Sequence, residues 1–227
     1  MLVYMGKQRK IVGKIVRTLL VGLVVFIAAG NLMILGANVL LRATVDSPAA
    51  PKLPGIENIA AVDQHLWRGG APNATGYKAL ARNGVGTIVD LRAERDLQVD
   101  EQLLRRLGLK RIHIPMRDGQ APTPDQVERF LSVMQASKKR VFVHCGAGVG
   151  RTGTMAASYL VETGKAESSE ALGRNLAVGP PSLEQITYVA GLSGEDVSSP
   201  PAAITFMSRV IDGPRRMWVN ITHAYQD

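Results

Sequence analysis

The sequence contains one cysteine, and the residues around it have the types and spacing of a catalytic site. The apolar run 141–143 is followed by His144 and Cys145, then by a loop with three glycines, and Arg151 opens a predicted helix. Glycines let successive backbone N–H groups converge on one anion, and the start of a helix adds partial positive charge at that point. Arg151 adds a planar fork for two oxyanion contacts. We therefore expect Cys145 to act as a thiolate nucleophile inside a cradle for a tetrahedral anion.

The string HCGAGVGRTG, residues 144–153, resembles the signature of the protein tyrosine phosphatase superfamily, which is His-Cys-five residues-Arg-Ser/Thr. The resemblance covers roughly residues 56–192 and points to the compact dual-specificity-like branch, of the bacterial membrane-anchored or periplasmic type. It implies a phosphocysteine formed on Cys145, no metal and no other cofactor. It also implies that the substrate phosphate is bound by Gly146, Ala147, Gly148, Val149, Gly150 and Arg151. A structural cysteine in a glycine-rich turn is the alternative.

The family chemistry also needs a general acid that protonates the leaving oxygen. Asp118 lies 27 residues before Cys145, after one predicted strand and before a capped helix, and this short spacing resembles the dual-specificity branch. The alternative for Asp118 is an Asp-Gly turn. Asp125 is the rival acid, but it lies in the first turn of a predicted helix, where an acidic residue is expected for the helix dipole alone.

Further residues match the family with weaker assignments. The resemblance implies that His144 shapes the loop and that the Thr152 hydroxyl stabilises the leaving thiolate, although Thr152 also suits an ordinary first helical turn. Arg68 and Arg92 lie in the blocks LWRGGAP and IVDLR, which resemble those of compact phosphatases, and we expect both to be framework or pocket-rim residues. Gln185 either positions water or, as we favour, completes a capping box.

Apolar strands alternate with amphipathic helices along the middle of the chain. This alternation predicts an α/β fold with a central, mostly parallel sheet flanked by helices. The expected strands are 59–62, 66–68, 87–91, 110–114 and 141–144, and the expected helices are 73–83, 94–107, 124–137, 151–163, 167–177 and 182–192.

The net charge of +8 at 227 residues initially suggests nucleic acid or an anionic surface as partner. Residues 1–42 carry +6 of it without any acid, whereas 43–197 and 198–227 carry +1 each. The nearly neutral middle and an aromatic content of 5% argue against nucleic acid. A single cysteine excludes a disulfide framework and a cysteine-rich zinc site.

Residues 19–41 contain no charged side chain. As a helix they would extend roughly 34 Å, enough for one tilted crossing of a hydrocarbon core about 30 Å thick. Five Lys or Arg residues precede this run, so the positive-inside rule places the N-terminus in the cytoplasm and the remainder outside, which is the periplasm in a Gram-negative bacterium. A cleaved signal peptide ending near Gly30 and a soluble core helix are the alternatives.

These observations predict five segments. They are a basic cytoplasmic N-terminus (1–18), a transmembrane signal-anchor helix (19–41), a Pro-rich linker (42–55), a phosphatase domain (56–195) and a poorly periodic C-terminal extension (196–227). We expect the linker to be an extended spacer that holds the domain off the bilayer, or otherwise a loop packed on the domain.

The loop 146–150 carries no charge, which favours protein phosphotyrosine, or dual-specificity activity, over substrates with extra phosphates. A lipid or inositol phosphate phosphatase is the alternative, because an anchored domain could reach a headgroup. A non-catalytic phosphate-binding module is a further alternative, disfavoured because Cys145, Asp118 and Arg151 are all present. The expected partners are a phosphorylated protein and the membrane, with no nucleic acid.

Overall fold

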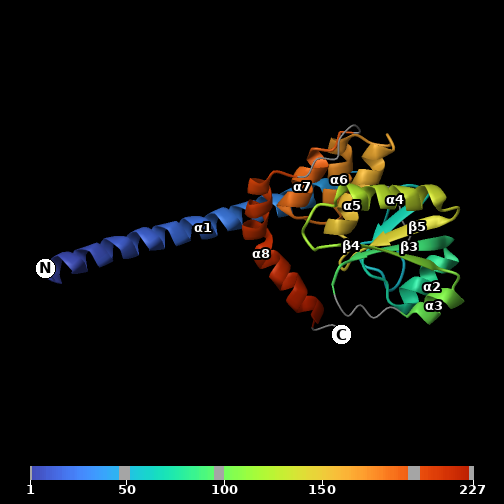
Figure 1. Cartoon of the computed structure of the whole chain (residues 1–227), viewed down its shortest axis with the longest axis horizontal. Helices are drawn as coiled ribbons and strands as arrows, with labels where there is room; N and C mark the ends of the chain where they lie inside the picture. Colours follow the sequence, from blue (N-terminus) through green and yellow to red (C-terminus); the bar gives the residue numbers. More distant parts are fainter. Residues whose placement is uncertain (1, 46–51, 95–99, 194–199, 225–227) are drawn as a thin grey trace.

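The computed structural model describes residues 2–45, 52–94, 100–193 and 200–224. Its centre is a five-stranded sheet of order β1-β2-β5-β3-β4, in which β1 pairs antiparallel with β2 and the other neighbours run parallel (Figure 1). The predicted α/β fold with a mostly parallel sheet is therefore confirmed. The strands are β1 Ala60–Ala61, β2 Leu66–Gly69, β3 Val85–Arg92, β4 Lys110–Met116 and β5 Arg140–His144.

Helices cover both faces of the sheet because the central strands alternate their apolar side chains between two cores. In β5, Val141 and Val143 face one core and Phe142 faces the other. The first core is closed by α4, α5 and α7, and the second by α2 and α3. These helices are α2 Ala74–Arg82, α3 Glu101–Arg106, α4 Pro124–Ala136, α5 Gly150–Glu162, α6 Ser168–Val178 and α7 Leu183–Ala190.

Local capping fixes where several helices begin. Thr123 caps α4 and Ser182 caps α7, and each forms a capping box with the glutamine three residues later. Both boxes confirm the sequence prediction. The helix predicted over 94–107 is wrong at its start, because the Asp100 side chain accepts from the Leu103 amide and α3 begins only at Glu101. Residues 95–99 lie outside the described part.

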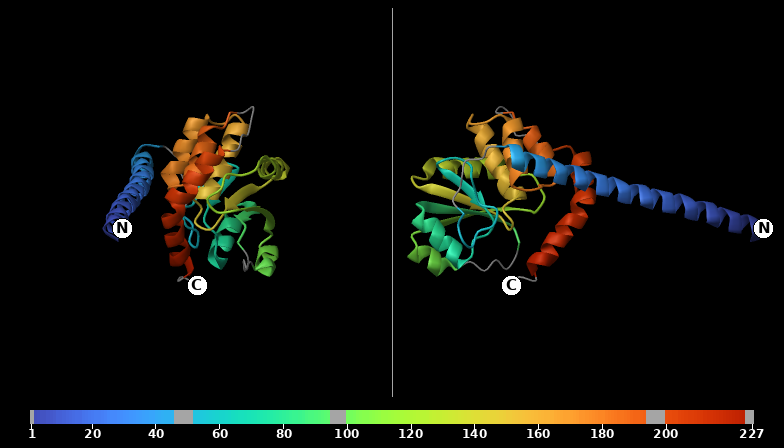
Figure 2. Two further views of the ribbon diagram at one scale, coloured as in Figure 1. Left: turned by 60° about the vertical axis from the view of Figure 1, so that its left-hand side comes forward. Right: turned by 180° about the vertical axis from the view of Figure 1, so that it is seen from behind.

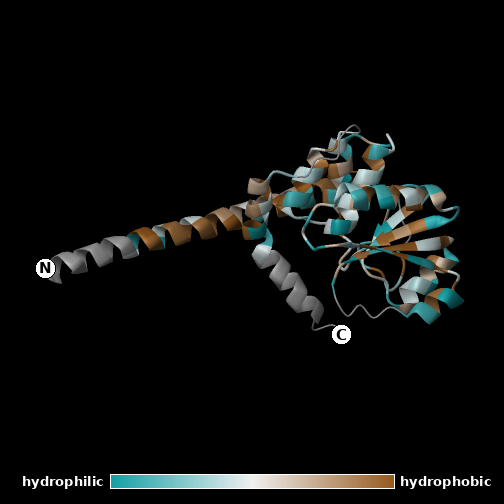
Figure 3. Ribbon diagram, in the orientation of Figure 1, coloured by the Kyte–Doolittle hydropathy of each residue, from teal (hydrophilic) through white to brown (hydrophobic). Residues whose placement is uncertain are grey.

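The chain outside the phosphatase-like core is more helical than predicted. The apolar run belongs to α1, Leu2–Thr44, so residues 42–44 continue a helix where an extended spacer was predicted. Within α1, residues 13–44 are long and apolar enough to cross a membrane (Figure 3). The poorly periodic C-terminal extension contains α8, Ala202–Ala224. Residues 46–51, in the predicted linker, lie outside the described residues.

The C-terminal third of α1 packs against the α/β domain, where it contacts α6 and α8 (Figure 2). The Asn31 side chain donates to the Ile211 carbonyl of α8 at 2.9 Å. The Asn38 side chain donates to a carbonyl at the end of α6, that of Leu176, at 2.5 Å. The two asparagines that interrupt the apolar run thus bind the helix to the domain.

Candidate active site

The site lies at the carboxyl edge of the parallel strands. β5 is the middle strand, and its last residue, His144, is in register with Gly69 of β2 and Asp90 of β3. Cys145 follows directly and is 3% exposed. The neighbouring strands therefore bring their ends around the thiol, as expected at the edge of a parallel sheet.

The loop 146–149 is held from outside through its backbone carbonyls. Because each carbonyl accepts a hydrogen bond from a group outside the loop, the opposite edges of these peptide groups, which carry the N–H donors, turn toward the loop interior. The Gly146 carbonyl accepts from the Ala71 amide at 2.7 Å, and the Ala147 carbonyl accepts from the Asn58 side chain at 2.9 Å. The Arg68 guanidinium donates to the next two carbonyls, those of Gly148 at 2.9 Å and Val149 at 3.1 Å.

Gly148 is required by the path of the loop. Its φ is +76°, and a Cβ there would lie 2.2 Å from the carbonyl carbon of Gly69. The left-handed conformation and the close approach of β2 each exclude a side chain.

Arg68 is a buried framework residue rather than a pocket-rim residue. Besides the two loop carbonyls it contacts Asn175 of α6 at 3.2 Å. Burial lowers its pKa to about 10, with the charge of Cys145 acting in the opposite direction. The guanidinium therefore stays charged at neutral pH and donates to the loop from below.

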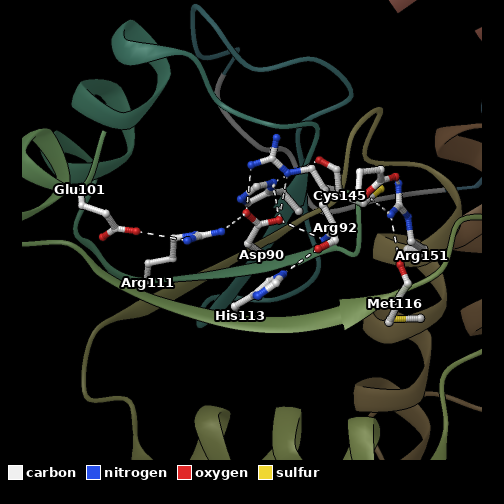
Figure 4. Close-up of polar contacts among 10 residues, drawn as sticks. Asp90, Arg92, Glu101, Arg111, His113, Met116, Cys145 and Arg151 are labelled. Atoms are coloured by element: carbon white, nitrogen blue, oxygen red, sulfur yellow. Dashed lines mark hydrogen bonds and ion pairs between the residues drawn. The ribbon is translucent and has the colours of Figure 1, made fainter. Parts of the chain in front are cut away.

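Arg151 lies at the start of α5, facing Cys145 (Figure 4). One of its terminal nitrogens donates to the Met116 carbonyl at 3.2 Å and to Glu94 at 2.9 Å, and the other pairs with Glu94 at 2.7 Å. Its Nε is buried and makes no hydrogen bond among the described residues, although Asp118 lies 3.5 Å away. Burial acts to lower the pKa of Arg151, but the Glu94 hydrogen bond and the charges of Cys145 and Asp118 outweigh it and raise that pKa.

Asp118 lies in the loop after β4, with its side chain 40% exposed and directed at Arg151. This loop is fastened to the first turn of α7. Ser182 donates to the Gly119 carbonyl at 2.7 Å, Glu184 accepts from the Ala121 amide at 3.0 Å, and Gln185 donates to the Gln120 carbonyl at 3.1 Å. The rival, Asp125, lies exposed in the first turn of α4.

Gln185 connects the two loops of the site as well as capping α7. A Cβ on Gly150 would lie 2.6 Å from its side-chain oxygen, so the same amide packs against the start of α5 and bonds the acid loop. The capping function was predicted from the sequence, whereas this bridging position was not.

His144 and Thr152 are both completely buried. Burial lowers the pKa of His144 to about 4, against the opposing charge of Asp90, so the imidazole is neutral at pH 7. Its Nδ1 lies 3.1 Å from the Cys145 carbonyl, which assigns the proton to Nδ1. The Thr152 hydroxyl has no protein hydrogen-bond partner among the described residues.

The buried Asp90 carboxylate holds two arginines beside the strand that leads to Cys145. Asp90 accepts from Arg92 at 2.9 and 3.0 Å and from Arg111 at 2.8 Å, and Glu101 holds the other side of Arg111 (Figure 4). Burial acts to raise the pKa of Asp90, but the hydrogen bond and charge of Arg92, the charge that His144 carries at acid pH, and the Arg111 hydrogen bond outweigh it and hold that pKa well below its usual range.

Sequence reasoning missed Glu94 and did not assign a role to Asp90. Asp90 is the last residue of β3 in register with β5, and Glu94 follows β3. Because parallel strands place their carboxyl ends at one edge of the sheet, this position beside the Cys145 strand is the signal that could have indicated both residues. Glu94 was placed inside a predicted helix, which hid this signal.

A cleft of about 290 Å³ lies beside the acid loop. Arg117, Asp118 and Glu184 line it from the α/β domain, whereas Ser208 and Arg209 come from α8. The C-terminal extension thus forms one wall of the cleft next to the candidate acid.

A family model described as "DSP-PTPase phosphatase fused to NAD+ Kinase" matches residues 55–191. The chain belongs to this family of dual-specificity-type phosphatase domains. "Probable NAD kinase 2, chloroplastic" of Oryza sativa subsp. japonica is 33% identical over 142 residues, which cover 57% of this chain and 14% of the rice protein. "Dual specificity protein phosphatase CDC14A" of Mus musculus is 32% identical over 92 residues, 40% of this chain and 15% of the mouse protein. The chain thus spans a small part of the length of these relatives.

Solved structures share the fold of the dual-specificity-type phosphatase domain. The P. aeruginosa protein TpbA superposes with a TM-score of 0.55 at 24% identity, covering 68% of this chain and 94% of TpbA. PTPMT1 in complex with PI(5)P superposes with a TM-score of 0.51 at 20% identity, covering 59% of this chain and 93% of PTPMT1.

Proposed function

We propose that this chain is a cysteine-dependent phosphatase that hydrolyses phosphate monoesters through a phosphocysteine intermediate. One observation carries the proposal: Cys145 follows the central strand beneath the loop 146–149, whose carbonyls accept hydrogen bonds from outside it, and faces Arg151. Within the described part of the chain the buried Nε of Arg151 makes no hydrogen bond, with Asp118 3.5 Å away. An oxyanion bound here could accept hydrogen bonds from this Nε and from the amides of the loop.

The proposed reaction has two steps. The Cys145 thiolate attacks phosphorus in line, the bond between phosphorus and the leaving oxygen breaks, and Asp118 gives its proton to that oxygen. Water then attacks the phosphocysteine, Asp118 takes the proton of the water, and the sulfur leaves as a thiolate. The Thr152 hydroxyl, at the first turn of α5, has no partner in the described ranges and is proposed to donate to that thiolate.

The test is hydrolysis of an aryl phosphate by the full chain with a metal chelator present. We expect vanadate to block wild-type activity and Cys145→Ser to abolish it while keeping the wild-type melting temperature. Equal activity in Cys145→Ser would disprove the mechanism. A folded wild-type protein that binds vanadate without turnover would instead identify a phosphate-binding module.

We propose protein phosphotyrosine, or dual-specificity substrates, as the substrate class, because the loop 146–150 carries no basic side chain for additional phosphates. The similarity to a protein named dual specificity protein phosphatase supports this assignment. Lipid or inositol phosphates are the second candidate, favoured by the apolar α1 and by the shared fold with a protein solved with PI(5)P. A panel of phosphopeptides, phosphoinositide vesicles and inositol phosphates separates the two by kcat/KM.

We further propose that α1 is a retained single-pass anchor, with its N-terminus in the cytoplasm and the catalytic domain outside it, which is the periplasm if the source is a Gram-negative bacterium. Five basic residues before the apolar run and the exposure of its side chains support this. Protease added to cells with a permeabilised outer membrane should digest the catalytic domain. Protection of the domain until the inner membrane is lysed would reverse the topology.

A further inference from the structure

Helix α8 crosses α1 at the point where α1 leaves the catalytic domain. Besides the hydrogen bond from Asn31 to Ile211, the two helices approach so closely that a Cβ on Gly30 would lie 3.2 Å from the Ile211 side chain. In Figure 1 and in the right-hand view of Figure 2, α8 runs crosswise to α1 and forms the edge of the domain from which the N-terminal half of α1 projects. The medium that surrounds the projecting part of α1 therefore also contacts this edge of the domain.

The contacts of α1 limit which part of it lipid can surround. Residues 31–44 have one side on α6 and α8, through Asn31, Asn38 and Arg42, so lipid cannot enclose them on all sides. Between residues 15 and 26 the large apolar side chains are exposed, as for Val24 at 65%. A 20-residue stretch that ends at Gly30 extends about 30 Å and matches the hydrocarbon core. This stretch begins at residue 11, so Lys14 and Arg17 lie in its first two turns, roughly 5 and 9 Å from its cytoplasmic end, and their long cationic side chains extend back to the headgroups.

The crossing point therefore marks the surface of the bilayer, and α8 lies at that level. Its inner face, with Ser208, Ile211 and Asp212, is buried on the domain. Phe206 is 69% exposed and Met207 is 38% exposed, and Arg209 beside them is exposed too. A crosswise helix that combines exposed large apolar side chains with arginine has the composition of an interfacial membrane helix.

We propose that α8 seats the catalytic domain directly on an anionic bilayer, with Phe206 and Met207 entering the boundary between headgroups and acyl chains and Arg209 meeting anionic headgroups. The proposal rests on α1 being a membrane span and shifts that span from the predicted 19–41 toward the N-terminus. Because Ser208 and Arg209 also line the cleft beside Asp118, the acid side of the site then opens next to the membrane surface.

The single native cysteine makes a site-specific test possible. In a Cys145→Ser background, Phe206→Cys carries an environment-sensitive fluorophore on the full chain, in nanodiscs holding one copy each in phosphatidylcholine with anionic phosphatidylglycerol. Val24→Cys reports incorporation of the span. The exposed Lys138→Cys, at the turn between α4 and β5, is the matched water-facing control. Lipids brominated near the headgroup end of the chain serve as quenchers.

We expect the label at position 206 to shift to the blue and to lose most of its intensity to the brominated lipids, while the label at 138 keeps its intensity. If the label at 24 is quenched and the label at 206 behaves as that at 138, the interfacial position of α8 is wrong although the span is correct. Blue-shifted emission at 206 that appears only with two copies per disc, and without lipid quenching, would overturn the proposal, because α8 would then contact a second copy of the chain and not the bilayer. Absence of quenching at 24 would overturn the span and this proposal together. The Phe206 result is independent of turnover, so it stands or fails separately from the phosphatase mechanism.

Discussion

The guanidinium of Arg151 divides its two edges between the protein and the proposed substrate. Glu94 and the Met116 carbonyl hold the edge formed by the two terminal nitrogens, which fixes the plane of the group. The Nε edge remains for two oxygens of the bound phosphate, with Asp118 close to the same side. Glu94 is therefore a positioning residue that orients the phosphate-binding fork.

Glu94→Gln should weaken this orientation without emptying the site. Replacing a charge-assisted bond to a half-exposed carboxylate by a neutral one costs about 1 kcal/mol, so we expect kcat/KM to fall roughly fivefold. Vanadate inhibition should weaken in parallel, which a merely structural loss would not produce at unchanged melting temperature. Tighter vanadate binding in the variant would show instead that Glu94 competes with the substrate.

Asp118→Asn tests the general acid. Removal of a proton donor typically lowers the rate by about 10²- to 10⁴-fold, and the loss should be largest for poor leaving groups such as alkyl phosphates and smallest for p-nitrophenyl phosphate. Asp125→Asn, in the exposed first turn of α4, is the matched control and should retain wild-type kcat. A leaving-group dependence that appears in the Asp125 variant alone would exchange the two assignments.

At the scale of elements, the phosphate loop depends on the close approach of β2. Gly148→Ala must accept both a left-handed backbone and a contact with the Gly69 backbone, so we expect loss of most activity and a lowered melting temperature. Gly164→Ala has a similar φ of +64° but open space around its Cβ, and it should lose about 1 kcal/mol of stability while activity is kept. Equal effects of the two substitutions on activity would remove the role of the β2 contact.

The same loop shows which parts of this structure can be predicted from the sequence. Residues 141–151 predict a strand, a glycine turn and a helix start, and Thr123 and Ser182 predict capped helices. These predictions succeed because each depends on residues close together in the sequence. The clamp of Arg68 and the ion pair of Glu94 join segments 57 or more residues apart in sequence, so no short motif records them. α8 lacks a regular pattern because one side packs on the domain while the other exposes both apolar and charged residues.

At the scale of the whole molecule, the buried His144 makes stability depend on pH. Its pKa is lowered to about 4 in the folded state, whereas an unfolded histidine has a pKa of about 6.5. Between these values the unfolded chain binds the extra proton, so stability falls as pH falls, by roughly 2 kcal/mol from pH 7.5 to 5. The lowered pKa of Asp90 also stabilises the fold, and this stabilisation is lost only below about pH 4, where the unfolded carboxylate takes up a proton.

Urea unfolding of the full chain in detergent, followed by circular dichroism at pH 7.5 and 5, measures this dependence. His144→Asn should flatten the change across that range, because the replacement does not titrate. An unchanged pH dependence in the variant would assign the effect to another group.

The solitary thiol also sets how this protein would respond to oxidants. A sulfenic acid on Cys145 normally escapes further oxidation by forming a disulfide with a neighbouring cysteine, and no other cysteine exists in these 227 residues. Protection would have to come from a backbone sulfenamide or from a thiol supplied by another molecule. In an oxidising compartment without such a thiol, oxidation would proceed to the irreversible sulfinic and sulfonic acids, so bound substrate or phosphate would be the main shield of the sulfur.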